Sequence, residues 1–181
     1  MWDVNSGNSG FWILDSGSLL KTMRTSKSKI KSRQELQGIV ARLRAEGETV
    51  VFTNGCFDLL HPGHVRYLEK ARAEGDVLVV ALNSDDSVRK IKGEDRPVLS
   101  EEERSEIMGA LGCVDFVTTF EEETPENIIE ELVPTVLVKG GDWPVEKILG
   151  RQVVESNSGR VLSIDFEEEF STSNIIRKIR G

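Results

Sequence analysis

Residues 50–82, VVFTNGCFDLLHPGHVRYLEKARAEGDVLVVAL, decide the fold class. The short apolar run Val50–Phe52 predicts a buried strand, and a loop leads from it to a helix from about Pro62 to Ala73, which Gly75 ends. The continuous apolar run Val77–Leu82 is typical of a strand that is buried on both faces of a parallel sheet. This stretch therefore predicts a strand–helix–strand unit.

The same alternation continues along the chain, so that strands and helices alternate five times. Capping boxes at Ser32 and Ser100, and a Thr-Pro pair at Thr124, mark three helix starts. The remaining expected elements are helices over 33–46, 100–111, 124–133, 145–157 and 171–180 and strands over 114–120, 135–138 and 161–166. Alternation of this kind predicts the α/β class. We expect a single Rossmann-like domain, with a five-stranded parallel sheet and helices on both faces.

The first 29 residues differ in composition from the rest of the chain. Gly and Ser recur between Ser6 and Ser18, and the only apolar pieces are 11–14 and 19–20. An acidic Asp3 near the start does not fit a secretory signal. We expect residues 1–29 to be a disordered extension or a segment upstream of the true start, for which Met23 is a plausible position. The folded domain is expected to cover residues 30–181.

Composition indicates a globular protein of one domain. The 181 residues include 23 Lys plus Arg and 31 Asp plus Glu, which gives a net charge of −8, and 38% are hydrophobic. The acidic balance argues against a nucleic-acid partner, and no apolar run approaches the roughly 20 residues of a membrane span. Two cysteines exclude a disulfide scaffold and a four-cysteine zinc site, and free thiols fit a reducing compartment. A cytoplasmic location is therefore expected.

Both histidines of the chain follow the first strand, where a parallel sheet binds its ligands. His61 and His64 are three residues apart around a Pro-Gly pair, so both imidazoles lie on one face of a first helical turn. They adjoin free backbone N–H groups and the positive end of the helix dipole. This arrangement suits a polyanion. The alternatives are two surface histidines at a helix start and a zinc site with Cys56 as a third ligand.

A second anion site is predicted at the start of the last helix. Ser171, Thr172 and Ser173 place three hydroxyl groups beside the free N–H groups of a helix N-terminus. Taken alone, such residues are more often a simple helix cap. Their place after the last strand, at the same edge of the sheet as the histidines, favours a phosphate site.

Cations and glycines follow two further strands. The densest basic stretch is 89–97, where Lys92 is the first choice for a phosphate contact, because the point charge of a lysine suits phosphate. Arg96 and Arg104 are further candidates, with structural roles as the alternative. The run 139–143, KGGDW, leaves room for a flat base whose edge Asp142 and backbone groups can read, and a simple turn is the alternative.

The cytidylyltransferase-like nucleotidyltransferase superfamily, the H-x-G-H enzymes, has a signature that is similar to residues 55–64, GCFDLLHPGH. Its second motif, S-T-S or S-T-T, is similar to residues 171–173. The resemblance implies that His61 and His64 stabilise the charge that develops when a phosphate oxygen attacks the α-phosphorus of a nucleoside triphosphate. It also implies that Mg²⁺ arrives on the triphosphate and has few protein ligands.

The resemblance, together with the strand-end pattern, gives three groups of expected site residues. The catalytic residues are His61, His64 and Lys92. The nucleotide-binding residues are Thr53, Asn54, Gly55, Cys56, Phe57, His61, Gly63, His64, Lys139, Gly140, Asp142, Ser171, Thr172 and Ser173. The substrate-binding residues are Asp58, Lys92, Arg96 and Arg104. No metal-binding residue is expected.

Within the superfamily, residues from about 30 to 180 resemble the adenylyltransferases that form ADP-heptose and pyrophosphate from ATP and D-glycero-β-D-manno-heptose 1-phosphate. The matching runs are FTNGCFD at 52–58, KGEDRPV at 92–98, VKGGD at 138–142 and STSNII at 171–176. Such enzymes are often fused behind a sugar kinase. Because no kinase domain fits in this chain, the resemblance implies functional pairing with a separate sugar kinase. Members of the superfamily are commonly oligomers, so a homo-oligomer is expected.

Two other functions stay open. A glycerol-3-phosphate cytidylyltransferase usually carries Arg-Thr-Glu-Gly before its S-T-T motif, whereas this chain has Glu167–Phe170 there and Phe166 in place of the Arg. A nucleotide-binding module without turnover would not need His61, His64 and Lys92 together. A dehydrogenase is excluded, because the first turn lacks G-x-G-x-x-G. The choice among ATP, CTP and GTP depends on a few contacts to the base edge that residue spacing does not reveal.

Overall fold

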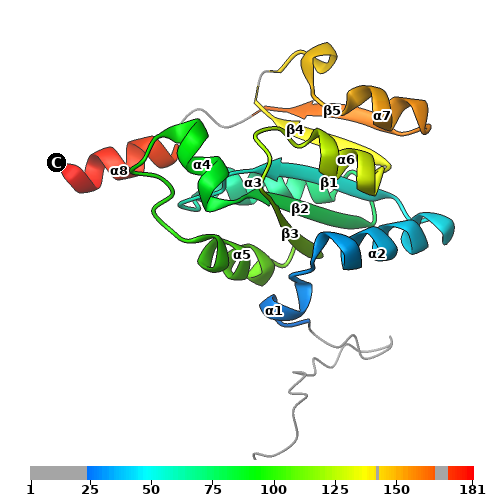
Figure 1. The fold of residues 1–181 in the computed structure, drawn as a ribbon, viewed down its shortest axis with the longest axis horizontal. Coiled ribbons are helices and arrows are strands. Elements are labelled where there is room, and N and C mark those ends of the chain that lie inside the picture. The colour runs from blue at the N-terminus through cyan, green and yellow to red at the C-terminus, as the bar shows by residue number, and fades with distance from the viewer. Residues whose placement is uncertain (1–23, 142, 166–170) are drawn as a thin grey trace, which may run out of the picture.

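A computed structural model describes residues 24–141, 143–165 and 171–181 of the chain. Within these ranges, five strands form one sheet in the spatial order β3-β2-β1-β4-β5, and all neighbouring strands are parallel (Figure 1). The strands are β1 (Val50–Gly55), β2 (Val77–Asn83), β3 (Phe116–Phe120), β4 (Val136–Gly140) and β5 (Arg160–Ile164). The helices are α1 (Ser26–Lys29), α2 (Arg33–Ala45), α3 (Pro62–Arg72), α4 (Asp85–Lys92), α5 (Glu101–Ala110), α6 (Glu126–Leu132), the 3₁₀ helix η1 (Val145–Lys147), α7 (Arg151–Ser156) and α8 (Thr172–Arg180).

The apolar side chains of the strands pack into two cores, one on each face of the sheet. Phe52 and Val79 pack with residues of α2, α6 and α7. Val51 and Val80 point the other way and pack with residues of α3 and α5. Because helices cover both faces, the strands need apolar residues at successive positions, and this explains the continuous apolar run in β2. The predicted fold class is confirmed.

Helix α4 was not expected from the sequence. Residues 85–92 form α4, where the sequence predicted a basic loop. The Ser84 hydroxyl caps this helix by accepting a hydrogen bond from the Ser87 N–H at 3.2 Å, and Asp85 and Asp86 place negative charge in its first turn. The single helix expected over 145–157 is instead divided into η1 and α7.

The described structure begins ahead of the expected domain boundary at residue 30. Helix α1 precedes that residue, and the Lys29 amine donates hydrogen bonds to the backbone carbonyls of Leu111 at 3.0 Å and Val114 at 2.7 Å. Ile30 then forms a parallel bridge with Val117 in the edge strand β3. These contacts join residues that are distant in sequence, so local composition did not reveal them. Residues 1–23 of the expected extension lie outside the described residues.

The strand order places the candidate site at the carboxyl end of β1. β2 and β3 lie on one side of β1, and β4 and β5 lie on the other. Open parallel sheets bind ligands beyond the carboxyl ends of the strands, at the point where the strand order reverses. Here that point lies between the ends of β1 and β4, at Gly55 and Gly140. Among the described residues, no helix is both long enough and apolar enough to span a membrane.

Candidate active site

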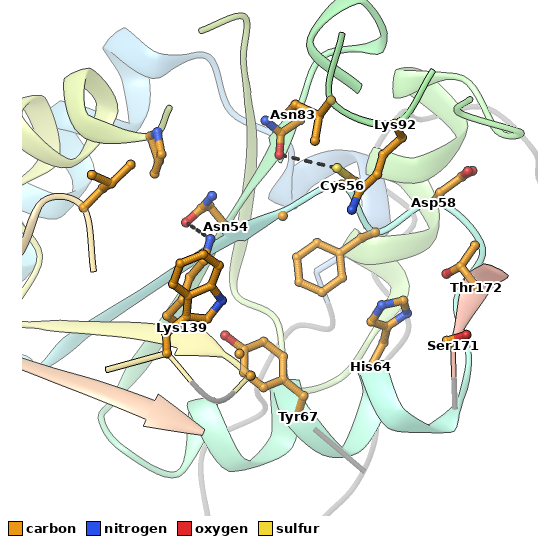
Figure 2. Close-up of a pocket in the computed structure, with 18 of the residues that line it drawn as sticks. Asn54, Cys56, Asp58, His64, Tyr67, Asn83, Lys92, Lys139, Ser171 and Thr172 are labelled. Atoms are coloured by element: carbon orange, nitrogen blue, oxygen red, sulfur yellow. Dashed lines mark hydrogen bonds between the residues drawn. The ribbon is translucent and has the colours of Figure 1, made fainter. Parts of the chain in front are cut away.

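A cavity of about 1000 Å³ opens at the point where the strand order reverses. It is lined by residues from the ends of β1, β2 and β4, from the loop after β3, and from the start of α8. Figure 2 shows His64, Ser171 and Thr172 on one side of the cavity and Asn54 and Lys139 on the other. Of the residues expected from the sequence, the cavity is lined by Asn54, Gly55, Cys56, Phe57, Asp58, His61, His64, Lys92, Arg96, Lys139, Gly140, Ser171, Thr172 and Ser173.

The two histidines stand together at the start of α3. Pro62 is the first residue of the helix, and its ring fixes the backbone angle that this position needs. His61 precedes it as the N-cap but makes no side-chain capping bond, so its imidazole does not serve as a helix cap. The rings of His61 and His64 are stacked, with centroids 3.8 Å apart and planes 18° apart.

Burial keeps both imidazoles neutral near pH 7. Burial, followed by the neighbouring His61, lowers the pKa of His64 from 6.5 to about 4. The pKa of His61 is also lowered by burial. The Nδ1 atom of His64 is buried and has no hydrogen-bond partner among the described residues. A buried nitrogen without a partner is costly, so it is suited to bond with a ligand that enters the cavity.

Phe57 and Gly55 give the loop before the histidines its shape. Phe57 has a φ of +39°, in the left-handed region that is uncommon for a residue with a side chain. Its ring meets the His64 ring edge-on, with centroids 5.2 Å apart. A Cβ atom on Gly55 would lie 2.9 Å from Cε2 of Phe57, so a larger residue there would displace the ring. The loop is therefore built around one aromatic ring that orients His64.

The start of α8 is docked against the histidine loop. The Thr172 hydroxyl donates a hydrogen bond to the Leu59 carbonyl at 3.1 Å, and this bond joins positions 113 residues apart. The Ser171 hydroxyl caps α8 by accepting from the Asn174 N–H at 3.1 Å. The predicted convergence of the two motifs on one cavity is therefore observed.

Lys92 and Lys139 approach the cavity from different strands. Lys92 is exposed at the C-terminal end of α4, and it points into the pocket beside Cys56 (Figure 2). The Lys139 amine lies 3.5 Å from Oδ1 of Asn54, and burial lowers the pKa of this amine. Burial raises the pKa of the Cys56 thiol, so this thiol is protonated and is not a reactive nucleophile near pH 7.

Two residues that were expected to bind substrate make bonds within the protein. Arg104 is 1% exposed and does not line the cavity, and its guanidinium donates to backbone carbonyls and pairs with Asp85. Asp58 lines the cavity, but it is 2% exposed and accepts a hydrogen bond from Arg96 at 2.6 Å. In the structure, both charges have partners inside the protein.

Of three other residues that were expected to contact the nucleotide, two do not line the cavity and one lies outside the described residues. Thr53 is fully buried, does not line the cavity and shares a 2.6 Å hydrogen bond with the Tyr67 hydroxyl. Gly63 is buried in the first turn of α3 and also does not line the cavity. Asp142 lies outside the described residues, as do Glu167–Phe170.

The cavity also has lining residues that were not expected from the sequence. They are Tyr67, Asn83, Ile91, Glu123, Thr124, Pro125, Leu137, Lys147, Ile148, Leu149 and Asp165. Gly141 and Trp143, which belong to the expected run 139–143, also line the cavity. The rule that ligands bind beyond the carboxyl ends of strands could have found Glu123, Thr124 and Pro125, which follow β3. Asn83 ends β2 and follows from the same rule.

The described His, Cys, Asp and Glu side chains were compared with the needs of a metal site. Among the described residues, no group of three His, Cys, Asp or Glu side chains is placed to hold a metal ion. The zinc arrangement of Cys56, His61 and His64 therefore has no support in the geometry. A Mg²⁺ ion that enters on a nucleoside triphosphate would keep phosphate oxygens and water as its main ligands.

The fold, the paired histidines and the serine-rich helix start define a nucleotidyltransferase-like site. The chain belongs to the cytidylyltransferase-like family, whose family model matches residues 52–178. The resemblance expected from the sequence is therefore confirmed.

Among curated proteins, the chain is similar to bifunctional proteins named HldE. It is 56% identical over 152 residues to HldE of Geobacter sulfurreducens, a match that covers 84% of this chain and 31% of that protein. It is 50% identical over 151 residues to HldE of Haemophilus influenzae, covering 83% of this chain and 32% of that protein. The chain thus spans about a third of the length of these relatives.

Solved structures show the same fold. The lipopolysaccharide core biosynthesis protein from Thermoplasma volcanium matches with a TM-score of 0.54 and 26% identity, covering 67% of this chain and 98% of that one. Pantothenate synthetase from Thermus thermophilus matches with a TM-score of 0.56 at 19% identity, covering 81% of this chain and 67% of that one. At that identity the second match supports the fold alone.

Proposed function

We propose that this chain transfers AMP from ATP to D-glycero-β-D-manno-heptose 1-phosphate, which yields ADP-heptose and pyrophosphate. One observation carries the proposal: His61, His64 and the hydroxyl groups of 171–173 line the same cavity, although they come from distant parts of the chain. The similarity to the HldE proteins, and to a structure described as a lipopolysaccharide core biosynthesis protein, supports the choice of substrates.

The reaction is an in-line displacement at the α-phosphorus of ATP. A phosphate oxygen of the sugar phosphate forms a bond to the α-phosphorus, and the bond from that phosphorus to the oxygen that bridges to the β-phosphate breaks. Pyrophosphate leaves with that oxygen, so no covalent enzyme intermediate is needed. Mg²⁺ enters as part of the nucleotide substrate and offsets charge on the phosphate oxygens.

His61 and His64 act on the charge that develops at the α-phosphate. Each imidazole is neutral near pH 7, so each offers one N–H that can donate to a phosphate oxygen. Donors that are held in place before the reaction stabilise the transition state without a cost of reorganisation. The stacking of the two rings and the edge contact with Phe57 restrict their orientation.

The hydroxyl and lysine groups bind the remaining phosphates. Ser171, Thr172 and Ser173 adjoin the free N–H groups of α8, which suit the β- and γ-phosphates. Lys92 approaches from α4 and offsets the charge that two anionic substrates bring together. Lys139 supplies a further cation at the end of β4.

The segment after β4 suits the base. Gly140 and Gly141 follow the strand, and Trp143, which is 51% exposed, lines the cavity with Leu149. A flat apolar surface beside glycine backbone can stack a purine and read its edge. A preference for ATP over CTP and GTP is part of this proposal.

We also propose a kinase-type reaction as the source of the acceptor. A sugar 1-phosphate is made by phosphoryl transfer to a sugar, and the relatives are bifunctional proteins about three times as long as the matching region. A homo-oligomer and a cytoplasmic location stay predictions.

The test is a matrix of substrates. ATP, CTP and GTP are each combined with heptose 1-phosphate and with glycerol 3-phosphate, and pyrophosphate release is measured. We expect turnover with ATP and heptose 1-phosphate. Turnover only with CTP and glycerol 3-phosphate would indicate the cytidylyltransferase alternative, and nucleotide binding without release would indicate a binding module.

Matched variants connect the turnover to the site. His64→Ala should lower kcat by about two to three orders of magnitude, which is typical for the loss of one preorganised donor to the transition state. Ser171→Ala with Ser173→Ala should raise KM for ATP. Ser156→Ala is the control for the serine variants, because this serine on α7 bonds to the Val153 carbonyl and the Asn157 side chain and does not line the cavity.

A further inference from the structure

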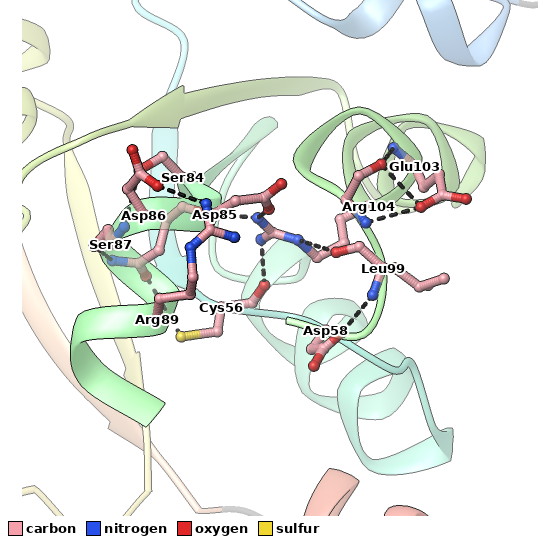
Figure 3. Close-up of polar contacts among 12 residues, drawn as sticks. Cys56, Asp58, Ser84, Asp85, Asp86, Ser87, Arg89, Leu99, Glu103 and Arg104 are labelled. Carbon is pink, nitrogen blue, oxygen red and sulfur yellow. Dashed lines mark hydrogen bonds and ion pairs between the residues drawn. The ribbon is translucent and has the colours of Figure 1, made fainter. Parts of the chain in front are cut away.

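The buried guanidinium of Arg104 contacts three separate segments around the cavity without lining it (Figure 3). Its Nη1 donates to the Cys56 carbonyl at 2.7 Å. Its Nη2 donates to the Asn83 carbonyl at 2.9 Å and to Oδ1 of Asp85 at 2.7 Å. Its Nε donates to the Leu99 carbonyl at 3.1 Å. A planar arginine can make all these bonds at once, whereas a lysine cannot.

Two of these segments lead to the chemical groups of the proposed reaction. Cys56 lies in the loop that leads from β1 to the histidines. Asn83 ends β2, and Asp85 begins α4, whose last residue is Lys92. The position of Lys92 relative to the histidines therefore depends on how α4 is held against the β1–α3 loop, and Arg104 joins these two elements.

A second contact holds the same loop from the other side. Asp58 accepts from Arg96 Nε at 2.6 Å, from the Val98 N–H at 2.9 Å and from the Leu99 N–H at 3.1 Å. These bonds connect the β1–α3 loop to residues 93–99, which link α4 to α5. Leu99 takes part in both sets, since its N–H bonds to Asp58 and its carbonyl bonds to Arg104.

From this geometry we infer that Arg104 is a positioning residue that sets the distance between Lys92 and the histidine pair. The inference rests on the proposed function. Arg104 touches no substrate, and it acts through the Cys56 carbonyl on one side and through the Asp85 carboxylate on the other. None of the four bonds of Arg104 goes to α8, which meets the same loop separately at the Leu59 carbonyl, so nucleotide binding by α8 should depend on Arg104 less than the position of Lys92 does.

A double-mutant cycle tests the inference. Arg104→Gln should lower kcat roughly 10- to 100-fold and change KM for ATP less than about threefold. The reason is that the variant disturbs the position of Lys92 relative to the histidines but keeps the groups that bind ATP in the ground state. Lys92→Ala should then cost much less in the Arg104→Gln background than in the wild type, since residues that act through one another are not additive. Arg104→Lys keeps the positive charge and should not restore the rate.

The matched control is Arg72→Gln at the opposite end of α3. Arg72 also donates to a backbone carbonyl, that of Gly75, and pairs with Asp115 at 3.1 Å. It lies outside the cavity, so its loss should leave kcat unchanged. If Arg104→Gln fails to fold, Asp85→Ala can replace it. Asp85 is partly exposed, and its loss breaks the bond between Arg104 and α4, so the double-mutant cycle is then made with Asp85→Ala and Lys92→Ala.

Hydrogen exchange provides a second measurement that needs no turnover. In Arg104→Gln, the amides of residues 55–61 and 93–99 should exchange faster than in the wild type, whereas Arg72→Gln should leave them unchanged. If the wild-type protein shows no turnover, the proposed function is overturned. Hydrogen exchange still tests whether Arg104 holds the two segments in place. The inference is overturned if kcat stays within about twofold of wild type, if the effects of Arg104→Gln and Lys92→Ala are additive, or if exchange in these segments is unchanged.

Discussion

Replacement of His64 by glutamine should make the stability of the protein less dependent on pH. Burial and the adjacent His61 lower the pKa of His64 from 6.5 to about 4. The unfolded chain therefore binds a proton that the folded protein excludes. The contribution of the neutral His64 to the free energy of unfolding is complete above pH 6.5 and is lost as the pH falls towards 4. Linkage between these two pKa values gives a loss of about 2 kcal/mol from pH 7 to pH 5, which solvent screening of the partly exposed ring reduces to about 1–2 kcal/mol.

The assay is urea unfolding of the wild type and of His64→Gln at pH 7 and at pH 5. Glutamine keeps a polar side chain and does not titrate in this range. The free energy of unfolding of the wild type should fall by about 1–2 kcal/mol more than that of the variant. If both proteins lose the same amount on acidification, His64 is not held neutral by burial, and the proposed role of a neutral imidazole donor is wrong.

Three further predictions concern the packing of the fold and the lining of the cavity. Tyr67→Phe removes the 2.6 Å bond to Thr53 and should destabilise the protein by about 1–2 kcal/mol in thermal unfolding; an unchanged Tm would contradict the role of this bond. Gly75→Ala would place a Cβ 2.6 Å from the Thr49 carbonyl oxygen. The free energy of unfolding measured in urea should therefore fall by about 1–3 kcal/mol, and an unchanged value would refute the tight contact. Lys139→Met removes a partly buried cation from the cavity and should raise the KM of one substrate by roughly tenfold or more in initial-rate measurements, whereas unchanged KM values would exclude a phosphate contact.

The sheet could be predicted from the sequence because its strands are buried on both faces. Continuous apolar runs such as 77–82 are distinctive, and capping boxes at Ser32 and Ser100 mark helix starts from side chains only three residues apart. Helix α4 was missed because its charged residues hide the helical pattern, although Ser84 and two acidic residues form a normal helix start.

The site could be predicted only in part, because residue type indicates charge but not the partner of that charge. The histidines and the serine-rich helix start were found because each motif is local. The sequence predicts substrate roles for Arg104 and Asp58 because most of their partners lie 19 to 48 residues away along the chain, where no local pattern reveals them. The left-handed backbone of Phe57 depends on the packing of its ring, which no sequence pattern indicates.

The central claim is that the histidine pair and the start of α8 act on one triphosphate. The most direct measurement is a crystal structure of the protein with α,β-methylene ATP, whose carbon bridge prevents loss of pyrophosphate. The α-phosphate should lie within hydrogen-bond distance, about 3 Å, of His61 or His64, and the β- or γ-phosphate should contact the hydroxyl groups of 171–173. A triphosphate that contacts only one of these two motifs, or that lies elsewhere, would contradict the account.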